Sequence, residues 1–157
     1  MVYLIIRIFK LKISIRSESL NEINFNWIVK ISLGGKLSSN DFQNTFNMLR
    51  EVLNEHEKKL HVHIDKKDTY YLNAGYDEKR KTDIFFGAVM IKKNYVSYHL
   101  MPVYCEPKLL KDISPELKKR MQGKSCFNFK TIDKEHLKEL TALTKKSFEY
   151  YKKEGMD

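Results

Sequence analysis

Cysteine, proline and glycine are scarce in this chain of 157 residues, which has two, three and six of them. Cys105 and Cys126 form neither a CxxC pair nor a zinc-ligand framework. Two isolated cysteines without a signal peptide indicate a reducing compartment, and we expect the cytoplasm. No apolar run approaches the roughly 18 residues that a membrane span needs. No internal repeat and no low-complexity tract is present.

Charge is abundant and uneven. The formal net charge is +9 and the sequence pI is about 9.4. Residues 1–38 hold six basic and two acidic side chains, which contribute +4 and leave +5 for the remainder. This balance favours a solvated, lysine-rich surface over nucleic-acid attraction. The 42% of hydrophobic residues suits one globular domain with one core.

The first 38 residues differ in pattern from the rest. Their basic residues interrupt the apolar stretch MVYLIIRIFKLKISIR, whereas a signal peptide keeps its charges at the start. The alternation over residues 7–15 suits a strand or a basic amphipathic segment on a membrane surface. Because every clear structural signal begins at Ser39, we expect residues 1–38 to be an extension and residues 39–157 to be the domain.

The body begins with a helical pattern. Asn40 is a suitable N-cap for a helix over residues 41–59, and its apolar residues recur at helical spacing: Phe42, Phe46, Leu49, Val52 and Leu53. Strand patterns follow at residues 60–65, 69–74, 83–91 and 95–104, with a polar loop at 75–82. The third strand is apolar on both faces, which indicates a central position.

A short helix, a strand and a long helix complete the pattern. Ser114 and Pro115 mark the start of the short helix, and Gly123 marks its end. A strand over residues 125–130 precedes a terminal helix capped by Asp133. The predicted buried stripe of this helix comprises Leu137, Leu140, Thr144, Phe148 and Tyr151. The order α-β-β-β-β-α-β-α predicts an α+β domain with a mostly antiparallel sheet of about five strands and helices on one side.

Three stretches carry a family resemblance: FFGAV from Phe85, IKKNYVSYHLMPVY from Ile91, and ISPELKKRMQGKSCFNFK from Ile113. Over residues 41–153 the chain resembles the bacterial YdhG-like family, domain of unknown function 1801. The resemblance implies a small α+β fold like that of the secretion chaperones. It implies no established activity, although a frataxin-like iron-chaperone role has been proposed for some members.

A pocket is the first candidate site. Ser97, His99 and Met101 share one face of a predicted strand, and Tyr104 and Cys105 follow them. Phe86 and Phe127 are the expected apolar lining. A Cys/His dyad for nucleophilic catalysis is not indicated, because nothing in the sequence shows a low-pKa thiol beside the histidine.

A basic turn is a weaker candidate. Gly123, Lys124 and Ser125 resemble the tail of a phosphate loop, but Lys118 occupies the position of the required first glycine. Arg120 and Lys124 flank the turn and leave a bare anion site open.

A metal site is the alternative. His61, His63 and Asp65 alternate along one predicted strand face, and imidazole suits iron or zinc. Exposed glutamates on the first helix, Glu51, Glu55 and Glu57, are harder ligands that suit an iron carrier. A merely polar outer strand face explains the same histidines.

Binding without catalysis is the predicted function. Tyr70, Tyr71, Phe85 and Tyr95, with Lys92 and Lys93 nearby, are suited to stacking on nucleic-acid bases. An uncovered sheet face suits a homodimer or a protein partner equally well. We therefore expect a cytoplasmic, non-enzymatic domain that uses its open sheet face and the region from His99 to Phe127, without a cofactor.

Overall fold

The computed structural model describes residues 39–155, and the predictions about residues 1–38 lie outside this range. The first half contains α3 (Ser39–Asn54), the 3-10 helix η1 (Glu57–Lys59), β1 (His61–Lys66), β2 (Thr69–Asp77), β3 (Thr82–Ile91) and β4 (Val96–Leu100). The second half contains α4 (Met101–Cys105), η2 (Pro107–Asp112), α5 (Pro115–Lys118), β5 (Met121–Gln122), β6 (Cys126–Phe129) and α6 (Lys134–Lys153).

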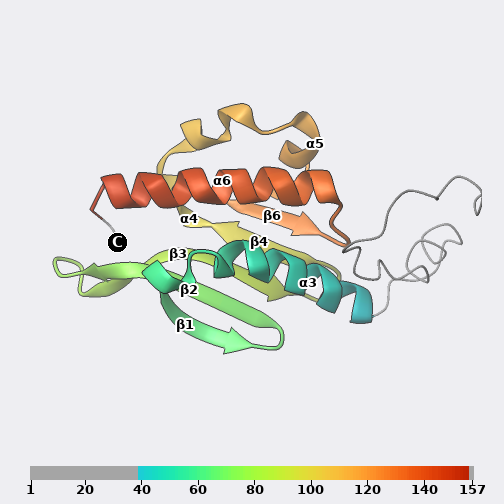
Figure 1. Cartoon of the computed structure of the whole chain (residues 1–157), viewed down its shortest axis with the longest axis horizontal. Coiled ribbons are helices and arrows are strands. Elements are labelled where there is room, and N and C mark those ends of the chain that lie inside the picture. Colours follow the sequence, from blue (N-terminus) through green and yellow to red (C-terminus); the bar gives the residue numbers. More distant parts are fainter. Residues whose placement is uncertain (1–38, 156–157) are drawn as a thin grey trace, which may run out of the picture. The chain divides into compact units, whose positions relative to one another are not determined.

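The strands form one antiparallel sheet in the order β1-β2-β3-β4-β6-β5 (Figure 1). The predicted α+β class is therefore confirmed. The apolar strand β3 lies between β2 and β4, as its sequence indicates. The sheet has six strands rather than about five, because β5 was not predicted.

The two long helices, α3 and α6, pack on the same face of the sheet (Figure 1). Their inward stripes are largely the predicted ones. The buried residues of α3 include Phe46, Leu49, Val52 and Leu53, and those of α6 include Leu140, Thr144, Phe148 and Tyr151. Neither helix, nor any other within residues 39–155, combines the length and apolar character needed to cross a membrane.

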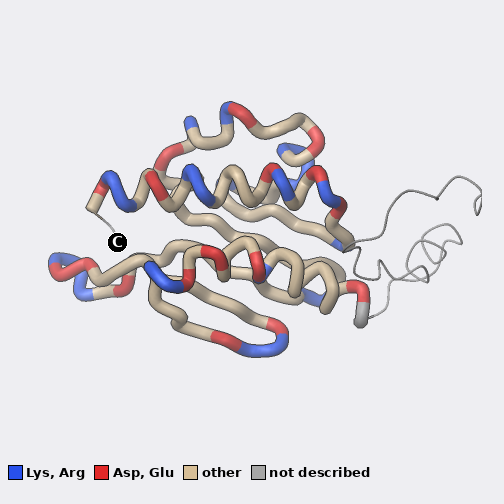
Figure 2. Tube along the Cα trace, viewed as in Figure 1, with Lys and Arg blue, Asp and Glu red and all other residues tan. Residues whose placement is uncertain are grey.

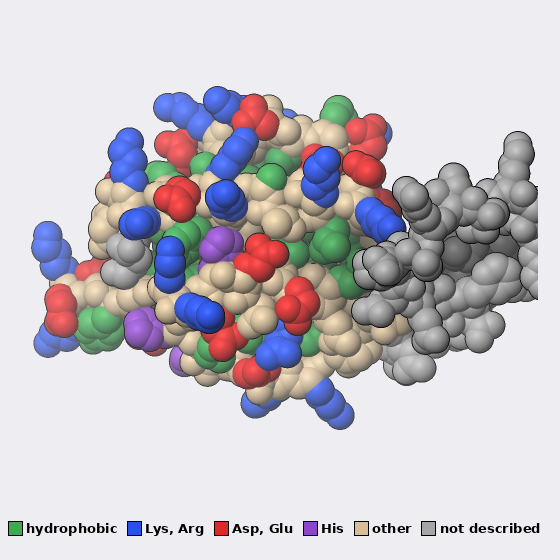
Figure 3. Space-filling model, viewed as in Figure 1, with side chains coloured by type: hydrophobic (Ala, Val, Ile, Leu, Met, Phe, Trp, Pro, Cys, Tyr) green, Lys and Arg blue, Asp and Glu red, His purple; other side chains and the backbone are tan. Residues whose placement is uncertain are grey.

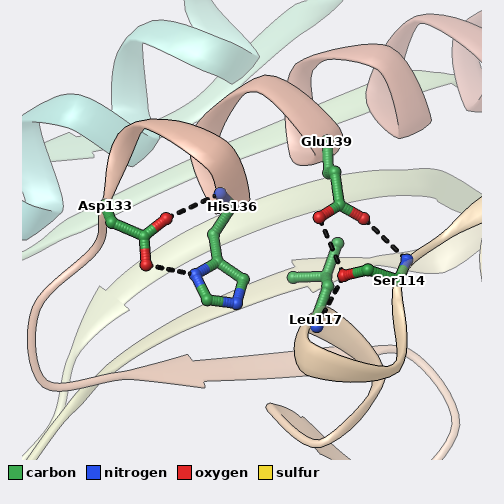
Figure 4. Close-up of polar contacts among 5 residues, drawn as sticks. All are labelled: Ser114, Leu117, Asp133, His136 and Glu139. Atoms are coloured by element: carbon green, nitrogen blue, oxygen red, sulfur yellow. Dashed lines mark hydrogen bonds and ion pairs between the residues drawn. The ribbon is translucent and has the colours of Figure 1, made fainter.

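Polar caps fix the start of α6 and its contact with α5 (Figure 4). Asp133 accepts the backbone N–H of His136 at 2.8 Å, which confirms the predicted cap. Ser114 Oγ accepts the N–H of Leu117 at 3.1 Å. Glu139 on α6 accepts both the backbone N–H and the hydroxyl of Ser114, at 2.7 and 2.8 Å. The short helix is therefore held to the long one by a charged acceptor.

Several element boundaries differ from the predictions. The helix α3 begins at Ser39, so Asn40 lies inside it, and it ends at Asn54 before η1. The hairpin strands β2 and β3 extend into the predicted loop and leave only residues 78–81 between them. The helix α5 ends at Lys118, and Gly123, with φ +70, lies in the β5–β6 turn.

The strand predicted over residues 95–104 ends at Leu100, where α4 begins. Pro102 lies in the first turn of α4, where its missing N–H costs nothing and its fixed φ suits a helix. Met101 and Tyr104 therefore belong to a helix and do not continue the strand face of Ser97 and His99.

An irregular register in β3 separates two adjacent phenylalanines. Leu72 pairs with Gly87 and Asn73 pairs with Phe85, so Phe86 is left without a partner on β2. The Phe86 ring packs against Phe148 and Tyr151 of α6, whereas the Phe85 ring stacks on Tyr71. Neighbouring side chains thus serve the core and the opposite sheet face.

His56 packs where α3 gives way to η1, and its ring stacks on Phe148 with centroids 4.9 Å apart. Burial lowers the pKa of His56, although Glu55 and Glu149 oppose this effect and Lys59 and Lys145 add to it. As the pH falls below about 6.5, His56 therefore takes up a proton in the unfolded chain before it does so in the folded protein.

We expect the free energy of unfolding to fall as the pH drops from 7.5 to 5.5, and to fall less in His56→Asn. Urea unfolding at both pH values measures this difference. Burial also lowers the pKa of His99, so part of the pH dependence should remain. His61→Asn, at an exposed position on β1, is the control. The same pH dependence in wild type and His56→Asn would contradict the prediction.

Charges of both signs are distributed over the helix-covered face. Lysine and arginine side chains project from it with acidic side chains among them (Figure 3). Both signs also occur at the tip of the β2–β3 hairpin (Figure 2). Among the residues that the structure describes, this face therefore presents no continuous basic stripe of the kind that tracks a nucleic-acid backbone.

Candidate functional site

A groove of about 820 Å³ opens between the β2–β3 hairpin, α4 and the C-terminal end of α6. Figure 1 shows the hairpin tip and the end of α6 at the same end of the domain. The lining from the hairpin and β3 comprises Tyr76, Asp77, Glu78, Lys79, Arg80, Thr82, Asp83, Ile84 and Phe85. The lining from the helices comprises Met101, Tyr104, Cys105, Tyr151, Glu154 and Gly155.

The hairpin side of the groove is shaped by its turn. Asp77 Oδ1 accepts the backbone N–H groups of Lys79 and Arg80 at 2.9 and 3.0 Å, an arrangement typical of an aspartate-nucleated turn. Lys81 completes the turn with φ 52, which is unusual for a residue other than glycine. The turn places Tyr76 at the groove with 51% of its surface exposed.

Tyr151 connects the helix side of the groove to the sheet. Its hydroxyl donates to the backbone oxygen of Phe85 at 3.1 Å and lies 4.0 Å from Cys105 Sγ. Burial raises the pKa of Tyr151, and the nearby Cys105 adds to this effect. The phenol is therefore held neutral and acts as a donor that joins α6 to β3.

The walls of the groove are aromatic and its rim is charged. Tyr104 is 53% exposed, and the Nζ of Lys124 stands 5.1 Å from the centroid of its ring. Four carboxylates and two cations line the groove, a formal charge of −2. One cation, Arg80, is engaged with Asp77 at 3.6 Å. The lining of the groove is therefore acidic, with the Lys124 ammonium at its edge, on a chain whose net charge is +9.

The sheet face opposite α3 and α6 carries a row of rings from four strands. His63 of β1 lies 5.3 Å from Tyr71 of β2, which stacks at 4.4 Å on Phe85 of β3. Phe85 meets the edge of His99 of β4 at 5.0 Å. The Nε2 of His99 bonds Ser125 Oγ at 2.8 Å, and burial lowers the pKa of His99. Such cross-strand pairs also stabilise a sheet.

The predicted pocket residues separate into four groups. Met101 and Tyr104 line the groove, whereas Ser97 and His99 lie on the opposite sheet face. Phe86 and Phe127 are fully buried in the core. The prediction of Phe86 and Phe127 as lining residues is therefore wrong, because the bulge turns Phe86 toward α6 and Phe127 pairs with the core residue Tyr98.

Arg120 and Lys124 form the fourth group, next to the β5–β6 hairpin. Both side chains are exposed. The Lys124 ammonium lies over the ring of Tyr104. The fold therefore brings these two predicted site residues, Lys124 and Tyr104, together at the edge of the groove.

The predicted metal triplet is divided. The register shift between Val62 and Ile64 ends the alternation, and Asp65 turns to Arg50 of α3 at 2.7 Å. His61 and His63 line a small depression of about 230 Å³ with Asp83 instead.

The glutamates of the alternative metal site do not converge with these histidines. Glu51 and Glu55 are exposed on and just beyond α3, and Glu57 accepts the hydroxyl of Tyr70 at 2.7 Å. Among residues 39–155, no three histidine, cysteine or acidic side chains come together as metal ligands.

An amide and a carboxylate lie side by side in that small depression. Asn73 Nδ2 donates to Asp83 Oδ2 at 3.1 Å, which leaves the buried Oδ1 of Asn73 without a partner. Tyr76 and Asp83 also line the groove, so the two hollows adjoin.

Most residues that line the groove are not among the site residues predicted from the sequence. Tyr76 and Glu78 were assigned to a polar loop, and Tyr151 was assigned only to the buried stripe of its helix. The useful signal was local: aromatic residues at the ends of regular elements, where a side chain is only partly covered. Nothing in the sequence brings residues 76–85 next to residues 151–155.

The chain matches no protein-family model, and no curated protein or solved structure is significantly similar to it. The resemblance to the YdhG-like family therefore stays a prediction.

Proposed function

We propose that this protein is a cytoplasmic, non-catalytic binding domain that takes a small organic ligand in the groove between the β2–β3 hairpin, α4 and α6. The observation that carries this proposal is the groove itself. Its volume of about 820 Å³ falls within the roughly 300–1,000 Å³ typical of ligand sites, and its walls are largely apolar.

The elements around the groove support a preformed site. Tyr151 ties α6 to β3 through the backbone oxygen of Phe85, and Asp77 holds the hairpin turn. A site built on such restrained parts loses little conformational entropy when a ligand binds. Ile84 and Met101 provide apolar contact, and both pack against the core.

The thiol and imidazole groups favour binding over nucleophilic catalysis. Burial raises the pKa of the Cys126 thiol, which is the opposite of what an attacking thiolate needs. On the neighbouring strand, the Nε2 of His99 is already hydrogen-bonded to Ser125 Oγ at 2.8 Å. Cys105 lines the groove, but its Sγ lies 4.0 Å from the neutral hydroxyl of Tyr151 rather than beside a base.

The row of rings on the opposite sheet face supports a second candidate function, the docking of a partner. Its members are partly exposed, and the two long helices lie on the other face. A flat, aromatic surface is typical of protein and nucleic-acid contacts. Mapping the responding residues separates this function from ligand binding in the groove.

A fragment titration followed by amide NMR shifts tests the proposal on the full chain. We expect aromatic fragments to shift amides of residues 76–85, 101–105 and 151–155. Tyr104→Ala removes one exposed wall and should weaken binding roughly threefold to tenfold, because aromatic contacts contribute about 1 kcal/mol.

Met48→Ala is the matched control, since Met48 is an exposed hydrophobic residue on α3 outside the groove. It should leave fragment affinity unchanged. Shifts confined to Tyr71, His99 and their neighbours would assign binding to the open sheet face instead. An absence of shifts at millimolar fragment would refute a ligand site in the groove.

A further inference from the structure

We propose that the ligand of the groove is an organic ammonium ion: a cationic amine attached to an apolar, ring-sized body. This inference rests on the proposed function and adds the chemical class of the ligand. It depends on the sign of the charges around the groove, on the aromatic faces that line it and on the hydrogen-bond acceptors beside it.

The lining charges are the first argument. Glu78 and Glu154 approach from the hairpin and from the end of α6, and both side chains are exposed. Asp77 and Asp83 bring the lining to four carboxylates, against Lys79 and Arg80. The C-terminal end of the 20-residue helix α6 lies at the same place and adds partial negative charge, which Lys152 and Lys153 in its last turn oppose. A cation is stabilised there and an anion is repelled.

The aromatic faces are the second argument. Tyr76 and Tyr104 line the groove with 51% and 53% of their surfaces exposed, and the face of an aromatic ring attracts a cation. The chain itself provides an example, because the Lys124 ammonium stands 5.1 Å from the Tyr104 ring centroid. The aliphatic stem and ammonium group of lysine have the chemistry proposed for the ligand.

The neighbouring acceptors are the third argument. Asp83 lines both the groove and the smaller depression, whereas Asn73, whose buried Oδ1 has no donor, lines only the depression. A carboxylate and an amide oxygen are acceptors and need N–H groups. An ammonium ion supplies N–H donors and a positive charge. A carboxylate, phosphate or sulfonate has no N–H group and carries negative charge.

A set of three probes with one apolar body tests the inference by calorimetry on the full chain. The probes are 3-phenylpropylammonium, 3-phenylpropanol and 3-phenylpropanesulfonate. We expect the ammonium to bind roughly tenfold more tightly than the sulfonate, with the alcohol between them. Added salt should weaken the binding of the ammonium and leave that of the alcohol unchanged.

Two double variants assign the preference to the groove. Glu78→Gln with Glu154→Gln should cost the ammonium roughly threefold to tenfold in affinity and leave the alcohol unaffected. Glu116→Gln with Glu135→Gln makes the same charge change at exposed positions outside the groove and should have no effect. Glu135 lies near the other end of α6, roughly 28 Å from Glu154 along the axis.

The outcomes separate the inference from the proposed function. Equal affinity for the three probes, or tightest binding of the sulfonate, would overturn the ammonium assignment and leave a ligand-binding groove. Ammonium binding that resists the Glu78/Glu154 change would place the cation elsewhere and overturn the assignment. No heat from any probe at millimolar concentration would overturn both.

Discussion

Phe86→Ala should lower the free energy of unfolding by about 3–5 kcal/mol, because it empties a closed part of the core. The Phe86 side chain is fully buried, and its ring meets the edges of Phe148 and Tyr151 at centroid distances of 6.2 and 5.7 Å. Removing it deletes the apolar burial and both edge-to-face contacts. Urea unfolding at neutral pH measures the difference.

Phe85→Ala is the matched control, one residue away with the same side-chain change. Phe85 is only partly buried and faces Tyr71 and His99 on the opposite sheet face. Its loss should cost about 1–2 kcal/mol, the value of partial burial and its ring pairs. If the two alanine variants were equally destabilised, or if Phe85→Ala were the worse, the bulge at Phe86 would be assigned incorrectly.

Thr144→Val should cost about 2–3 kcal/mol, even though valine has nearly the same shape as threonine. Tyr98 on β4 and Thr144 on α6 are both fully buried, and their hydroxyl oxygens lie 2.6 Å apart. The Thr144 hydroxyl donates to the backbone oxygen of Leu140 at 2.7 Å, so the proton between the two side chains belongs to Tyr98. Valine leaves that donor buried without an acceptor.

Tyr98→Phe should cost only about 1 kcal/mol, because Thr144 keeps its bond to Leu140. The double variant Tyr98→Phe with Thr144→Val should be more stable than Thr144→Val alone, since no unpaired donor remains. Thermal and urea unfolding of the four proteins complete a double-mutant cycle. Strictly additive costs would show that the two hydroxyls do not depend on each other.

Local sequence signals predicted the fold class and several element ends. Ser114 and Asp133 mark helix starts because their side chains accept a backbone N–H of the first turn. Pro115 marks one because its fixed φ suits the first helical position. The stripes of α3 and α6 were readable because a helix buries one face at a fixed spacing. The apolar run of β3 indicated a central strand because both faces of a central strand carry apolar residues.

Register and boundaries were less predictable. Alternation assigned His61, His63 and Asp65 to one face, but the bulge in β1 breaks that period and Asp65 pairs with Arg50. A bulge adds one residue to one strand of a pair, so its cause lies in the partner strand as much as in its own sequence. Met101 and Tyr104 followed a strand pattern until Pro102, which favours the first turn of a helix.

By itself, then, the sequence determined most of the helical and extended segments, how several of them begin, and which residues supply most of the core. These features depend on backbone geometry and on contacts within a few residues. Tertiary structure alone decided the candidate site. Tyr76, Met101 and Tyr151 lie on three elements, and the packing of α6 against β3 brings them together. Such long-range proximity depends on how whole faces pack, which no local pattern encodes.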